Sequence, residues 1–85
     1  MDNLPARMEI NDALANIALA ERYLALNDTN GAHEAWIDAE AHYKRARSMV
    51  TRDNPGVIQD NIEKLKIKLG QLRTAIVNSS RNRAK

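Results

Sequence analysis

The clearest pattern of apolar positions lies in the last third of the chain. Six large aliphatic residues recur there at spacings of four, three, four, three and four: Ile58, Ile62, Leu65, Leu69, Leu72 and Ile76. This repeat places all six side chains on one face of an α-helix and is typical of the buried seam of a helical bundle. The pattern therefore predicts that this helix supplies the spine of the core.

Two earlier segments carry weaker apolar repeats with helical spacing. The middle segment alternates small and large residues on one face: Ala32, Trp36, Ala39, Tyr43, Ala46 and Val50. The first segment carries Ile10, Ala13, Leu14, Ile17, Ala20 and Leu24. Alternating sizes allow helices to interdigitate, so we expect both segments to pack on the third. If the middle helix runs antiparallel to the last, Trp36 lies near Leu72 and Tyr43 near Leu65.

Clusters of turn-forming residues separate the three segments, at 27–31 and 52–56. Pro5 and Pro55 suit the first turn of a helix, and Asn54 suits the capping position before it. We therefore expect helices near 5–26, 31–51 and 55–78, and short connections between helices of similar length favour antiparallel neighbours. The sequence predicts an all-α, three-helix antiparallel bundle, with one domain over 1–78 and a flexible basic tail over 79–85.

The composition narrows the class of protein. The chain is 44% hydrophobic and 28% charged, which is typical of a folded soluble domain. It contains no apolar stretch of the roughly 20 residues that a membrane-spanning helix needs, and no cysteine, which excludes disulfides and thiolate metal sites. The first residues show no secretory-signal pattern, so we expect a cytoplasmic protein without a membrane anchor.

Charge is distributed unevenly along the chain. Residues 1–53 hold six lysines and arginines against nine acidic residues, whereas residues 54–85 hold seven against two. The basic side chains are candidates for phosphate contacts: Lys64, Lys66, Lys68, Arg73, Arg81, Arg83 and Lys85. One interpretation is therefore a nucleic-acid or ribosome-associated accessory protein that uses the last helix and the tail.

Catalytic chemistry has little support in the sequence. His33 and His42 are nine residues apart, which does not let two imidazoles on one helix share a metal ion. Asp38 and His42 are four apart and suit a hydrogen bond, but no nucleophile or oxyanion cradle accompanies them. Glu21 interrupts the apolar face of the first helix, and we expect its carboxylate in water at the edge of that face. We expect no catalytic residue, no cofactor and no metal; an enzyme whose site is completed by another subunit is the weakest alternative.

A second set of apolar positions faces away from the expected core. On the first helix it comprises Met8, Leu19, Tyr23 and Leu26, and on the last helix Ile67, Gly70, Thr74 and Val77. Apolar seams of this kind are how a bundle recruits a partner helix or a second copy of itself. The sequence therefore favours a non-enzymatic helical protein–protein interaction module, such as an adaptor, small inhibitor or assembly factor, possible as a homodimer. The expected partner-binding residues are Leu19, Tyr23, Leu26, Ile67, Gly70 and Val77.

The segment Trp36-x-x-Ala39-x-x-x-Tyr43-x-x-Ala46 resembles a tetratricopeptide helix, and the three-helix layout is similar to domains of microtubule-interacting and trafficking proteins. The resemblance covers one hairpin and implies peptide binding in a groove. Ala39-Glu40 stand where the tetratricopeptide consensus has Leu-Gly, and no second copy of the repeat follows. We therefore assign no family from the sequence.

Overall fold

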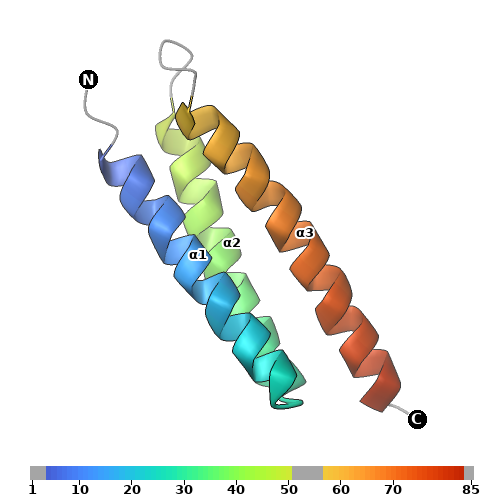
Figure 1. Cartoon of the computed structure of the whole chain (residues 1–85). Helices are drawn as coiled ribbons and strands as arrows, with labels where there is room; N and C mark the ends of the chain where they lie inside the picture. Colours follow the sequence, from blue (N-terminus) through green and yellow to red (C-terminus); the bar gives the residue numbers. More distant parts are fainter. Residues whose placement is uncertain (1–3, 51–56, 84–85) are drawn as a thin grey trace.

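The computed structural model describes residues 4–50 and 57–83, which form three α-helices. Helix α1 spans Leu4–Ala25, α2 spans Thr29–Met49 and α3 spans Val57–Arg83. The helices run alternately down, up and down, side by side, in a rod of 51 × 16 × 15 Å (Figure 1). The predicted all-α, three-helix antiparallel bundle is confirmed. None of the described helices combines the length and the apolar character that crossing a membrane requires.

The apolar seam of α3 forms the spine of the core, as the spacing predicted. Its six large aliphatic side chains are between 1% and 6% exposed. Ile10 and Ile17 of α1 and Tyr43 of α2 are buried with them, and Leu24, Trp36 and Val50 pack against this cluster. Leu14 was also expected in the core, and this was wrong: it is 37% exposed, because it lies at the edge of α1 that borders α3 rather than beneath it.

Alanines form the small-residue part of the core. They are at most 4% exposed and come from α1 (Ala6, Ala13 and Ala20) and from α2 (Ala32, Ala35, Ala39 and Ala46). Because alanine adds only a methyl group, helices that meet through it can approach closely, and α1 and α2 are the closest pair in the bundle. Ala6 and Ala35 were not among the predicted core residues.

The connection between α1 and α2 is fixed by a helix-ending motif followed at once by a helix cap. Asn27 has a φ of 61°, and the N–H groups of Asn27 and Asp28 donate to the carbonyls of Leu24 and Tyr23 at 3.0 and 2.8 Å. This is the Schellman arrangement, which ends a helix with a left-handed residue. The Asp28 carboxylate then accepts a hydrogen bond from the Gly31 N–H at 2.9 Å and caps α2. Helix α2 therefore begins at Thr29, two residues before the predicted start.

Two hydrogen bonds set the antiparallel register of α2 and α3. The Trp36 indole N–H donates to the Leu69 carbonyl at 2.9 Å, so that Trp36 lies within one helical turn of its predicted neighbour Leu72. Near the other end of α3, the hydroxyls of Thr29 and Ser79 are 3.2 Å apart. The expected contact of Tyr43 with Leu65 stays a prediction, although both residues are buried.

The ends of the predicted helices differ from the observed ones mainly in α3. This helix continues to Arg83, five residues beyond the predicted end, so most of the segment expected to be a flexible tail is helical. The bond from Ser79 to the buried Thr29 gives the physical reason, because it attaches the extra turns to the start of α2. The predicted cap at Asn54 and the predicted helix start at Pro55 lie outside the described residues.

Candidate interaction surface on the outer face of α3

The outer face of α3 carries an apolar stripe on the side away from its buried seam, and at Val77 the stripe borders a groove toward α2. We call this the α3 outer stripe, and it consists of Ile67, Gly70, Thr74 and Val77. Its positions follow the same three- and four-residue spacing as the seam, shifted to the far side of the helix. Ile67 is 60% exposed and Val77 is 42% exposed. The stripe thus presents two branched aliphatic side chains to the surroundings, as expected from the sequence.

Gly70 and Thr74 make the middle of the stripe flat and free of unsatisfied polar groups. A Cβ atom built on Gly70 would have no neighbouring atom within 4 Å. The Thr74 hydroxyl donates to the Gly70 carbonyl at 3.1 Å, a bond within the same helix. Because the hydroxyl already has its partner, covering Thr74 with another protein would not leave a buried donor unpaired.

The three predicted residues of α1 do not share one environment. Leu19 is 41% exposed and Leu26 is 75% exposed, as an outward surface requires. Tyr23, however, is half-buried and packs against the core. Its ring lies against Gly31, where an added Cβ would approach Cδ1 of Tyr23 to 2.8 Å. Tyr23 is therefore only partly exposed, and its role in binding a partner stays a prediction. Gly31, just after the turn, is the residue whose missing side chain makes room for the Tyr23 ring.

The structure also separates the α1 positions from the α3 outer stripe. A groove of about 320 Å³ runs between these helices, and α1 borders it with Glu21 and Leu24 while α3 borders it with Lys68 and Gln71. Leu19 and Ile67 line neither this groove nor its continuation at Leu14. The two predicted halves of the surface therefore do not meet within one molecule. Glu21 is exposed at this edge, as expected.

The basic side chains of α3 are spread around the helix rather than gathered in one patch. Lys64 and Lys68 line the groove toward α1, whereas Arg81 lines a groove toward α2 that includes His33. The Arg73 guanidinium lies 5.8 Å from the centre of the Trp36 ring, in a cation–π contact. Lys66 is exposed. The side chains of Arg83 and Lys85 lie outside the described part of the chain.

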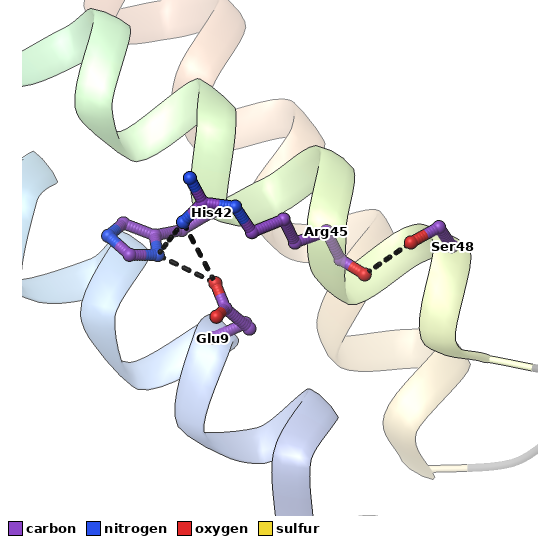
Figure 2. Close-up of polar contacts among 4 residues, drawn as sticks. All are labelled: Glu9, His42, Arg45 and Ser48. Atoms are coloured by element: carbon purple, nitrogen blue, oxygen red, sulfur yellow. Dashed lines mark hydrogen bonds and ion pairs between the residues drawn. The ribbon is translucent and has the colours of Figure 1, made fainter.

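A polar cluster joins α1 to α2 at a point where the sequence suggested another pair. His42 Nδ1 lies 2.6 Å from Glu9 Oε2, and Arg45 Nη1 lies 3.8 Å from the same oxygen (Figure 2). The expected partner of His42, Asp38, is instead exposed. Because α1 packs directly against this side of α2, it brings a carboxylate closer than the neighbouring turn of α2 can.

The chemistry of this cluster is that of an interhelical ion pair. The nearby Ser48 hydroxyl donates to the Arg45 carbonyl at 2.8 Å and is thereby engaged with the backbone (Figure 2). Within residues 4–50 and 57–83, no group of three or more histidine, aspartate or glutamate side chains is placed to hold a metal ion. The cluster thus ties α1 and α2 together.

Comparisons were made with protein-family models, with curated proteins and with solved structures. None of the three finds a match to this chain.

Proposed function

We propose that this chain is a non-enzymatic protein–protein interaction module, such as an adaptor, small inhibitor or assembly factor, that binds through the α3 outer stripe. The observation that carries the proposal is the exposure of Ile67 and Val77 on a helix whose opposite face is fully buried. These two side chains are therefore not part of the core. Action in the cytoplasm, expected from the sequence, is part of the same proposal.

The size of the stripe suits recognition by another helix. Its four positions extend over three turns of α3, which is the length over which a helix lying alongside makes side-chain contacts. Burying a branched aliphatic side chain contributes about 1.5 to 3 kcal/mol, so Ile67 and Val77 can supply several kcal/mol of binding free energy before entropic costs. The expected interaction is therefore specific in geometry and moderate in strength.

A partner-capture experiment with Ile67→Glu tests this proposal. The immobilised full-length protein is exposed to a lysate of its native host, with and without nuclease, and bound proteins are identified. We expect Ile67→Glu to lose the partner, because a carboxylate would be buried without a counter-charge. Helicity and melting temperature should be nearly unchanged, since exposed substitutions usually shift stability by less than about 0.5 kcal/mol.

Ile37→Glu is the matched control, because Ile37 is a comparably exposed isoleucine, 47% against 60%, on α2. It should keep the partner that Ile67→Glu loses. Equal capture by the wild type and by Ile67→Glu would refute the assignment of the α3 outer stripe. Capture that disappears after nuclease treatment would point to nucleic acid as the bound molecule.

The alternative, a nucleic-acid or ribosome-associated accessory protein, draws support from one observation. Within the described residues, every ion pair involves α1 or α2, and none involves the basic helix α3. Its cations are thus available to phosphates. They point to different sides of the helix, however, and Arg73 is engaged with Trp36. This arrangement favours weak, salt-dependent retention without sequence preference over a dedicated binding site.

A further inference from the structure

Charged residues of opposite sign continue the spacing of the α3 outer stripe at its two ends, and the one at the far end, Arg81, also borders the groove toward α2 together with Val77. Glu63 precedes Ile67 by four residues, and Arg81 follows Val77 by four. Both charged side chains are exposed, and neither forms an ion pair within the described residues. Along the outer face of α3, an acidic residue therefore comes first. An isoleucine, two small residues and a valine follow, and a basic residue comes last.

When two such helices lie antiparallel, the acidic position of each faces the basic position of the other, and the apolar positions face each other. From this complementarity we infer that two copies of the chain associate as a symmetric dimer in which their α3 helices pack antiparallel through the outer stripe. The inference rests on the proposed function and names the partner as a second copy. With the symmetry axis between Gly70 and Thr74, Ile67 lies opposite Val77 of the second copy. The same register places Glu63 opposite Arg81 of the second copy, twice per dimer.

The spacing of the stripe makes this register possible along its whole length. The six positions 63, 67, 70, 74, 77 and 81 alternate steps of four and three residues, which is the repeat of two helices packed side by side. A parallel arrangement in register would instead bring Glu63 against Glu63 and Arg81 against Arg81. Because like charges repel and opposite charges attract at such short range, the charge pattern selects the antiparallel pair.

Gly70 and Thr74 fit the centre of such a contact. Glycine lowers the stability of a helix interior relative to alanine, and nothing lies above Gly70 within the molecule to require the absence of a side chain. In the dimer, that absence lets the two backbones approach where the helices cross. Thr74, whose hydroxyl is bonded to the Gly70 carbonyl, packs opposite Gly70 of the second copy without an unpaired donor.

A charge-exchange series tests the dimer. Sedimentation equilibrium of the full-length protein at low ionic strength compares the wild type with Glu63→Arg, Arg81→Glu and the double variant carrying both changes. We expect the wild type to self-associate and each single variant to weaken association by about tenfold or more, because like charges would then face each other at both ends. The double variant should recover association, since the opposite charges are restored with their positions exchanged.

One control variant and one further variant of the stripe separate weaker association from loss of the fold. Asp38→Arg reverses an exposed charge on α2 away from the stripe and should leave association unchanged. Gly70→Ala should keep the fold, because its Cβ meets no atom, and should weaken association by holding the backbones apart. Helicity measured by circular dichroism should be the same for all variants.

Several outcomes would overturn the inference. One is a wild-type protein that stays monomeric over the whole concentration range, and another is a double variant that associates no better than the singles. A monomeric wild type whose capture of a different protein still depends on Ile67 would overturn the dimer while leaving the proposed function intact. A dimer indifferent to Glu63, Gly70 and Arg81 would show that a different surface is used.

Discussion

Gly31 and Gly70 both lie within helices, but only Gly31 is enclosed by neighbouring atoms. A Cβ atom at Gly31 would lie 2.8 Å from the Asp28 carboxylate and 2.8 Å from the Tyr23 ring. The absence of a side chain there lets Tyr23 close the α1–α2 turn while Asp28 caps α2. At Gly70 the same substitution meets open space, so the two glycines have different structural roles.

We expect alanine to be tolerated better at Gly70 than at Gly31. Gly70→Ala should raise the free energy of unfolding by about 0.5 to 1 kcal/mol, because alanine is the better helix former. Gly31→Ala should be less stable than Gly70→Ala by about 1 to 3 kcal/mol, because the added methyl group overpacks the turn. Urea midpoints at low protein concentration measure both, and a higher midpoint for Gly31→Ala than for Gly70→Ala would contradict the packing of Tyr23 described above.

Leu65 and Leu69 carry much of the burial at the centre of the core. Leu65 is 1% exposed and Leu69 is 5% exposed. Leu65→Ala or Leu69→Ala should each lower the free energy of unfolding by about 2 to 5 kcal/mol, through lost burial and the cavity left behind. In a domain of this size that is enough to unfold much of the protein. Thermal denaturation followed by circular dichroism measures the effect; Leu26→Ala, at a position 75% exposed, is the control and should stay within about 0.5 kcal/mol.

At the scale of the helices, the buried residues of α3 and the approximate position of Trp36 along α3 were predictable, whereas the alanine contacts and the end of α3 were not. A helix face made of six isoleucine and leucine side chains is stable only when it is buried, so all six were expected in the core. Alanine tolerates both burial and exposure, so the sequence did not distinguish the buried Ala6 and Ala35 from exposed alanines such as Ala15 and Ala18. The end of α3 was also missed, because the bond between Thr29 and Ser79 depends on how the helices are placed against each other.

The candidate surface and the polar cluster were also predictable only in part. Ile67, Gly70 and Val77 follow from helical period alone, since they lie opposite a strong buried seam, and all three are exposed. The partner of His42 lies 33 residues away on another helix, and no local pattern selects Glu9 over Asp38. The partial burial of Tyr23 did not follow from helical period, because the turn that follows it sets its environment. Local periodicity thus assigns positions to faces, but contacts across helices require the packed structure.

Trp36 of α2 makes two contacts with α3, a hydrogen bond to the Leu69 carbonyl and a cation–π contact with Arg73. Trp36→Phe removes the bond to the Leu69 carbonyl and weakens the contact with Arg73. We expect a loss of about 1 to 2 kcal/mol in the free energy of unfolding, because one hydrogen bond and one cation–π contact are affected. Arg73→Gln removes the second contact alone and should cost less. Urea unfolding followed by circular dichroism compares the two, and an equal or larger effect of Arg73→Gln would show that the indole hydrogen bond contributes little.

For the whole molecule, the ion pairs are distributed unequally among the three helices. Within the described residues, the ion pairs link α1 with α2 or lie within α2, at Glu9, His42, Arg45, Glu40 and Lys44. Helix α3 brings a net positive charge that has no such partners. Some charges of α1 and α2 are thus paired within the molecule, whereas no charged side chain of α3 forms an ion pair among the described residues.

The alanine-built contact between α1 and α2 has a consequence for how the rod comes apart. Each buried alanine methyl contributes only about 0.8 kcal/mol, whereas each large side chain of α3 contributes about 1.5 to 3 kcal/mol. Per residue, the seam of α3 thus contributes more burial energy than the alanines through which α1 and α2 meet. An α1–α2 hairpin without α3 would not offset the entropy of ordering its residues. We therefore expect folding to be a single all-or-none event, without a folded α1–α2 hairpin once α3 has left it.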